Sequence, residues 1–225
     1  MTFRAHIASV LLSLMCAIAQ GQQQDFVGLT GISVSKNISR AWDVSLGGQG
    51  MFNQNLHELW FAFADASIGY KINRNINTEL HSRSIQFRLL DNSYQGRQLF
   101  YHTISWSKGV GRFSFSVRNR IQQLIYGEHF HDDYKGPVWY NRDRFAVRYR
   151  INYYWSPYAS AEIMVPLNHT RRSGIDQYRI AGGISYTLND RVRFDTYYQI
   201  QQQLQRSTGN NTYFVLGFNT SIKLP

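Results

Sequence analysis

The sequence has no long apolar run after its first nineteen residues, and it has little cysteine and little proline. A membrane-spanning helix needs about 20 consecutive apolar residues, so residues 20–225 are not expected to cross a bilayer as helices. Cys16 is the only cysteine, so the chain that follows cannot form an internal disulfide. The four prolines are dispersed and no low-complexity linker divides the chain. These absences indicate one domain that is stabilised without disulfides.

The N-terminus has the organisation of a signal peptide. Arg4 precedes an apolar run over residues 7–18, and Ala17-Ile18-Ala19 supplies the small-residue pattern of a cleavage site. The run is too short for a transmembrane helix. We therefore expect residues 1–19 to be removed, which leaves residues 20–225 as the exported domain.

Charged residues are also scarce, at 17%, whereas aromatic residues reach 15%. The formal net charge of +10 would favour a nucleic-acid partner if the basic residues formed a helix face or a tail. They lie instead inside segments in which polar and apolar residues alternate. Nucleic-acid binding is therefore not expected.

Alternation is clearest over residues 139–155. Successive side chains of a β-strand point to opposite faces. Here one face carries the arginines, and the other carries aromatic and aliphatic residues. A helix, with 3.6 residues per turn, would scatter both sets. Similar alternation recurs over residues 42–52, 112–125, 191–203 and 213–224. Two breaks in phase, at residues 27–34 and 80–85, predict β-bulges.

Short and long connections alternate between these segments. Short turns are predicted at residues 36–37, 73–75, 109–111, 156–157 and 189–190, and longer loops near 53–58, 90–96, 127–137, 168–174 and 206–211. Aromatic residues at the segment ends predict two interfacial girdles. The girdle by the turns would hold Trp42, Tyr70, Trp106, Trp155 and Tyr158, and the girdle by the loops Trp60, Tyr126, Trp139 and Tyr213.

Together these features predict an all-β fold, an antiparallel transmembrane β-barrel in the outer membrane of a Gram-negative bacterium. A sheet that spans a bilayer must close on itself so that every backbone group is paired. Our division gives eleven strands, but bacterial single-chain barrels normally have an even number, so we expect ten or twelve. A soluble lipocalin-like barrel that binds a ligand is the alternative, because alternation alone fits both.

A family resemblance rests on three stretches of arginines and aromatics. They are Arg118-Asn119-Arg120, the run from Arg142 to Arg150 (RDRFAVRYR) and Asn168-His169-Thr170-Arg171. The chain resembles the outer-membrane barrels of the family called domain of unknown function 2490. The resemblance implies a barrel and no established activity. The predicted location makes outer-membrane lipids, lipopolysaccharide and the outer-membrane assembly machinery the expected partners, while the oligomeric state stays open.

One departure from typical barrels concerns the C-terminus. Barrel substrates of the assembly machinery often end in an aromatic residue, whereas this chain ends Lys223-Leu224-Pro225.

Arginines dominate the face that the barrel would turn inward. Unpaired buried charge is costly, so we expect nearby carboxylates or water to compensate them. One interpretation is a hydrated ion-pair network that stiffens the lumen, and the other is a narrow conduit that favours anions. The residues predicted to line the lumen are Arg118, Arg120, Arg142, Arg144, Arg148, Arg150, Glu79, Glu162 and Asp195.

Chemical motifs are weak elsewhere. Residues 128–133 (EHFHDD) match no metal-binding spacing, so no metal ion or other cofactor is expected. Asn168, His169 and Ser173 share one loop and leave a lipid hydrolase with a Ser/His pair as an alternative function. No residue is assigned a catalytic role, and we predict that the protein is not an enzyme.

Overall fold

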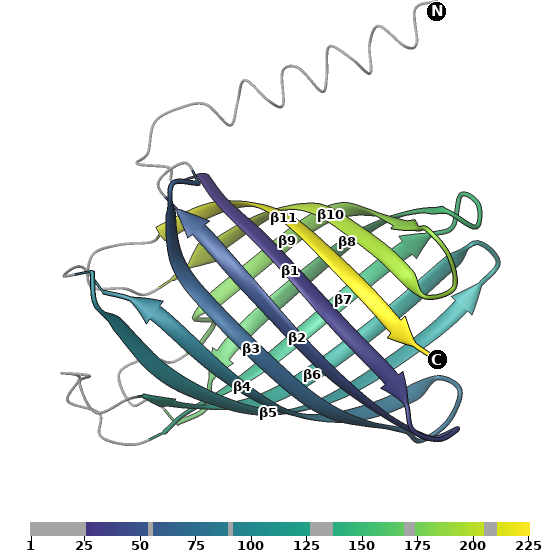
Figure 1. Cartoon of the computed structure of the whole chain (residues 1–225), viewed down its shortest axis with the longest axis horizontal. Helices are drawn as coiled ribbons and strands as arrows, with labels where there is room; N and C mark the ends of the chain where they lie inside the picture. Colours follow the sequence, from purple (N-terminus) through teal and green to yellow (C-terminus); the bar gives the residue numbers. More distant parts are fainter. Residues whose placement is uncertain (1–25, 54–55, 90–91, 127–136, 169–173, 205–210) are drawn as a thin grey trace, which may run out of the picture.

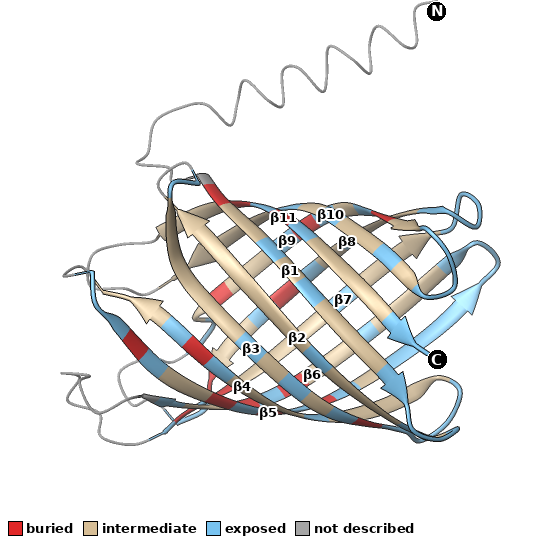
Figure 2. Cartoon of the chain, in the orientation of Figure 1, coloured by how far each residue is buried: buried red, intermediate tan, exposed pale blue. Residues whose placement is uncertain are grey.

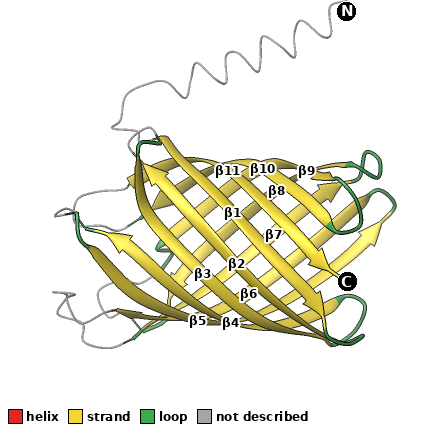
Figure 3. Ribbon diagram, viewed as in Figure 1, coloured by secondary structure: helices red, strands yellow, loops and turns green. Residues whose placement is uncertain are grey.

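The computed structural model describes residues 26–53, 56–89, 92–126, 137–168, 174–204 and 211–225, and its regular elements are strands (Figure 3). No helix in this part of the chain has the length and apolar character needed to cross a membrane. The strands are β1 (Phe26–Asn37), β2 (Trp42–Asn53), β3 (Glu58–Lys71), β4 (Ile76–Arg88), β5 (Tyr94–Val110), β6 (Phe113–Tyr126), β7 (Val138–Tyr149), β8 (Trp155–Pro166), β9 (Gln177–Thr187), β10 (Val192–Gln203) and β11 (Asn211–Leu224).

The eleven strands form one closed barrel. Each strand pairs antiparallel with its neighbour in sequence, and β1 pairs with β11 in parallel, from Phe26↔Phe214 to Lys36↔Leu224. With an odd number of antiparallel strands, the first and last run in the same direction, as Figure 1 shows. A parallel ladder also pairs the backbone groups of both strands, so closure does not require an even number. The expectation of ten or twelve strands is wrong.

The two faces of the sheet differ in chemistry. The side chains of β7 show the contrast, since Phe145 is 49% exposed on the outer face whereas Arg142 and Arg144 line a cavity inside the barrel. Figure 2 shows exposed positions distributed over the outer face. Each strand places at least one large exposed apolar side chain there: Ile32, Leu46, Ile68, Leu80, Ile104, Val117, Phe145, Ile163, Ile180, Tyr198 and Phe218.

Four of the five short turns are stabilised by the same pattern of side-chain to backbone hydrogen bonds. An Asn or Ser side-chain oxygen accepts hydrogen bonds from the backbone N–H groups two and three residues later, which fixes the reversal. Asn73 does so at 2.8 and 2.9 Å, and Ser39, Asn152 and Asn189 repeat the pattern. Two turns lie a few residues from their predicted positions, at 38–41 and 150–154. Residues 156–157, predicted as a turn, belong to β8.

The predicted bulges are wrong. Strands β1 and β4 pair with their neighbours without a shift in register. A shift occurs instead between Met51 and Phe52 of β2. The breaks in alternation have another cause. Apolar side chains such as Val27 and Ile85 are buried inside the barrel, where the pattern predicted polar residues.

Ile85 belongs to a layer of inward apolar residues near the loop end of the lumen. Ile85, Leu99 and Tyr101 are buried together, with Phe61, Phe63 and Leu124 packed against them. Trp60 stacks on Tyr213 at 6.1 Å between ring centroids, although β3 and β11 are separated in the sheet by β2 and β1. This contact places both rings inside the barrel mouth, so they do not belong to a girdle.

The turn end carries outward aromatic pairs close to the predicted girdle. Trp42 lies 4.8 Å from Tyr70, and Trp155 lies 4.6 Å from Tyr186, between ring centroids. Tyr158 departs from the prediction, because it lines a cavity of the lumen. The side chain of Tyr126 lies outside the described residues.

Candidate functional site

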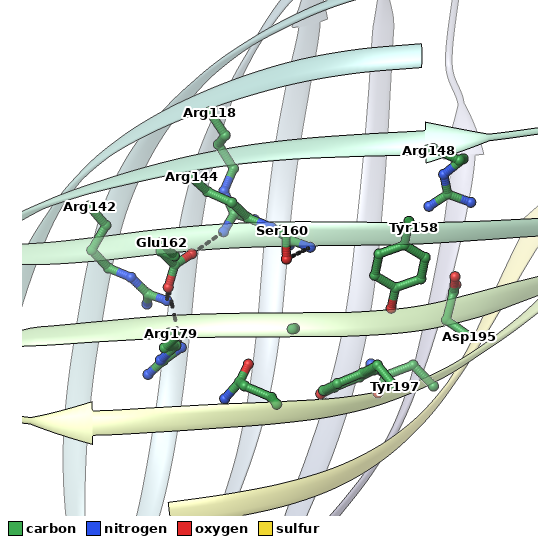
Figure 4. Close-up of a pocket in the computed structure, with 13 residues that line it drawn as sticks. Arg118, Arg142, Arg144, Arg148, Tyr158, Ser160, Glu162, Arg179, Asp195 and Tyr197 are labelled. Atoms are coloured by element: carbon green, nitrogen blue, oxygen red, sulfur yellow. Dashed lines mark hydrogen bonds and ion pairs between the residues drawn. The ribbon is translucent and has the colours of Figure 1, made fainter. Parts of the chain in front are cut away.

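A row of charged side chains crosses the lumen on four neighbouring strands. The hairpin registers place Arg118 opposite Arg144, Arg144 opposite Glu162, and Glu162 opposite Arg179. Because every second residue of a strand shares a face, Arg142 and Arg148 enter the same space. Figure 4 shows these side chains projecting into the lumen from β6 to β9.

Glu162 is the centre of this row. It is 8% exposed, and its two carboxylate oxygens accept hydrogen bonds from three guanidinium groups. Arg118 donates at 2.7 Å, Arg142 donates to the other oxygen, and Arg179 approaches that oxygen at 3.4 Å. One carboxylate thus compensates several buried cations, which makes it the key acidic group of the lumen.

The next residues toward the turns are linked through hydroxyl groups. Arg148 donates to Ser185 Oγ at 2.6 Å, and the Ser185 hydroxyl in turn donates to Asp195. Arg144 donates to Ser160 Oγ at 3.2 Å. Among the described residues, no ion pair within 4.0 Å joins Arg144 to a carboxylate.

A second network lies on β3, β4 and β5. Arg83 donates to Asp65 at 2.7 Å and to the Tyr101 hydroxyl at 2.9 Å, and that hydroxyl donates to Asp65 at 2.5 Å. His81 stands between two carboxylates, 2.9 Å from Asp65 and 3.0 Å from Glu79. Every acid of this network is already paired within it.

The two networks line neighbouring cavities of about 340 Å³ and 440 Å³, both of which include Arg118. Among the described residues, their lining contains seven arginines and four carboxylates, an excess of three positive charges with His81 counted as neutral. Arg120 is one of these seven arginines, and no carboxylate of the described part of the chain forms an ion pair with it. It approaches Thr103 Oγ1 at 3.3 Å and lies over the Tyr101 ring at 4.0 Å.

Most of the residues predicted to line the lumen lie in these cavities. Arg118, Arg142, Arg144, Arg148, Glu162 and Asp195 surround the smaller one, and Arg120 and Glu79 line the larger. Arg150 lies in neither. It follows the last residue of β7, is exposed, and donates its backbone N–H to the Arg112 carbonyl at 2.8 Å.

Sequence reasoning missed Arg179 and most of the second network, in which only Glu79 had been predicted to line the lumen. Alternation within residues 177–187 and 58–71 would have assigned Arg179 and Asp65 to the inward face. His81 and Arg83 were obscured because the phase break at 80–85 was interpreted as a bulge.

A third, larger cavity of about 810 Å³ lies at the turn end, and we call it the vestibule. The one carboxylate that the described residues contribute to its lining is Asp190, which accepts a hydrogen bond from the Tyr153 hydroxyl at 2.5 Å. Its basic side chains are Arg112, Arg150, Arg191, Arg193 and Lys223. Clefts lined mainly by one sign of charge concentrate ions of the opposite sign, and among the described residues of this lining the basic side chains outnumber the acidic one by four.

The residues considered for metal binding or for a Ser/His pair lie largely outside the described residues. Residues 128–133, His169 and Ser173 are in this category. Asn168 is described, and its side chain accepts a hydrogen bond from the Trp139 N–H and donates one to the Pro137 carbonyl. Among the described residues, no group of three or more His, Cys, Asp or Glu side chains is arranged to hold a metal ion.

Comparison with protein families now identifies the fold's relatives. Residues 28–213 match the family described as protein of unknown function DUF2490. The chain belongs to the DUF2490 family. No curated protein matches this DUF2490 chain.

Solved structures share its architecture. A NanC porin structure is similar with a TM-score of 0.53 and 14% identity, over 89% of this DUF2490 chain and 99% of the porin. The outer-membrane-expressed OmpT of Vibrio cholerae aligns with a TM-score of 0.38 and 10% identity, over 72% and 55% of the two chains. The β-domain of the Bordetella autotransporter BrkA aligns with a TM-score of 0.41 and 9% identity, over 84% of this chain and 94% of the β-domain. The NanC likeness shows that this DUF2490 member has a porin-like fold.

Proposed function

We propose that this protein is a non-enzymatic outer-membrane barrel whose lumen is a narrow conduit favouring small anions. The observation that carries the proposal is the charge of the lumen in the described part of the chain, where seven arginines face four carboxylates and all four carboxylates are engaged by neighbouring side chains. Rings of basic side chains favour anions wherever water passes. The basic vestibule supplies the same preference at the turn end.

The outer face supports insertion in a lipid bilayer. An apolar exterior around a charged interior is the reverse of a soluble lipocalin-like barrel, whose exterior must be polar. The exposed band of Leu46, Ile180 and Phe218 would contact acyl chains, with Trp42 and Trp155 at the interface. Outer-membrane lipids, lipopolysaccharide and the assembly machinery are the partners that this placement implies.

The apolar layer near the loops makes the conduit narrow. Ile85, Leu99 and Tyr101 occupy the lumen there, and Trp60 and Tyr213 meet across the mouth. We therefore expect small ion currents through the barrel in planar bilayers. A wholly structural role, with the ion-pair network only stiffening the barrel, is the second candidate, and the Glu162 cluster favours it.

Charge removal inside the lumen tests the conduit. Arg144→Gln combined with Arg148→Gln is expected to lower the chloride-to-potassium permeability ratio about twofold or more, because both cations line the cavity. The ratio is measured as a reversal potential across planar bilayers under a salt gradient. The control, Arg40→Gln with Arg74→Gln, removes equal charge from exposed turns and should change the ratio less. Equal effects in both pairs would refute selection by the lumen.

A further inference from the structure

A polar cluster lies on the outer face of the barrel, where the fold otherwise presents apolar side chains. Asn119 Nδ2 donates to Asn141 Oδ1 at 2.8 Å and to Asp143 Oδ1 at 2.7 Å, and Asn141 Nδ2 donates to the other Asp143 oxygen at 2.7 Å. These residues alternate with Arg118, Arg142 and Arg144, so they point away from the lumen. We call Asn119, Asn141 and Asp143 the outer triad.

The outer triad lies deep within the apolar band. Along β7 it falls between Trp139, near the loops, and Tyr149, near the turns. Each residue of a tilted strand advances ~2.5 Å along the barrel axis, so Asp143 is ~10 Å from Trp139 and ~15 Å from Tyr149. Its outward neighbours Phe145 and Ile163 are 49% and 39% exposed. Asn119 and Asn141 already donate to Asp143, but an ionisable side chain at this depth is still costly against acyl chains, and further polar contacts would lower that cost.

The same side of the barrel is hollowed. A groove of about 580 Å³ crosses β3 to β7, and its outer lining includes Ala66, Leu80, Phe100, His102, Ile121 and Trp139. Polar pairs border it, with Thr78 Oγ1 2.6 Å from His102 Nε2 and Gln98 donating to Ser82 Oγ at 2.9 Å. On β10 and β11, at the far side of the sheet order, the outer positions instead carry Tyr198, Leu216 and Phe218.

From this placement we propose that the outer face of β4–β7 is an interface that binds a second copy of this chain in the membrane. Polar contacts and close packing, rather than the hydrophobic effect, associate membrane-embedded proteins. The face is complementary to itself, because amides both donate and accept hydrogen bonds and His102 can donate to the Asp143 carboxylate of another copy. Leu80 and Phe100, 60% and 43% exposed in the lining of the groove, supply apolar side chains for packing against the same face of the other copy.

Single cysteines test the interface directly, since residues 20–225 contain none. Ile121→Cys, in the groove, and Leu216→Cys, on the far side, replace residues of similar exposure, 42% and 45%. With a short bismaleimide in outer-membrane vesicles, Ile121→Cys is expected to give a crosslinked homodimer and Leu216→Cys a background level. Equal crosslinking at both positions, or a crosslink from Ile121→Cys to a different protein alone, would overturn the proposal.

The outer triad is tested in the Ile121→Cys background. Asp143→Leu should reduce the dimer fraction about tenfold, because it removes the acceptor that the second copy binds. Asp143→Asn keeps an acceptor and should retain most of the dimer. Unchanged crosslinking with leucine would show that the triad is not part of the interface.

The inference rests on the membrane insertion proposed above, so folded protein in the membrane fraction is measured first for every variant. Absence from the membrane would refute the proposed function. A membrane-inserted chain without the Ile121→Cys crosslink would refute the interface alone.

Discussion

Glu162→Gln is expected to lower the free energy of unfolding by about 3–5 kcal/mol, because buried arginines lose the carboxylate that compensates them. Three guanidinium groups approach Glu162, and the side chain is nearly inaccessible. Denaturant titration of the refolded barrel in lipid vesicles, followed by tryptophan fluorescence, measures the change.

The matched control for that prediction is Glu58→Gln. Glu58 pairs with Arg88 at 3.0 Å, but its side chain is 35% exposed, so this replacement should cost less than about 1 kcal/mol. A similar decrease in the free energy of unfolding for both variants would mean that the lumen is well hydrated and that Glu162 has no special structural role.

Leu46→Lys is expected to destabilise the barrel by about 2–4 kcal/mol, the cost of a lysine in the middle of the apolar band. Leu46 is 68% exposed on the outer face of β2. Its neighbour Ser45 lines the cavity that contains Asp65 and Glu79, so Ser45→Lys should be tolerated better. Unfolding titrations in vesicles compare the two, and equal stability of both variants would contradict an outer face in contact with lipid.

The fold was largely predictable because alternation is a local property. Residues 139–155 showed which side chains share a face, and the structure places Arg142, Arg144 and Arg148 together in one cavity. The strand number was not predictable from a rule about even numbers, since the parallel pairing of β1 with β11 depends on closure of the whole sheet. Eleven segments were nevertheless visible in the sequence.

The sequence-based predictions were wrong where a strand departs from the rule that inward residues are polar and outward residues are apolar. Val27 and Ile85 are apolar yet face inward. If all inward residues are assumed to be polar, such residues interrupt the alternation in the same way as a β-bulge would. Asp143 shows the converse, a carboxylate on the outer face. The pairing of Glu162 with Arg142 and Arg179 depends on registers across three strands, which alternation alone does not supply.

The most direct test of the account is the conductance of the unmodified protein in planar bilayers, with ion selectivity taken from the reversal potential under a salt gradient. The apolar layer of Ile85, Leu99 and Tyr101 predicts small currents, and the excess of lumen arginines predicts that they are carried by anions. A large, cation-selective current through the wild-type barrel would contradict both parts of the account.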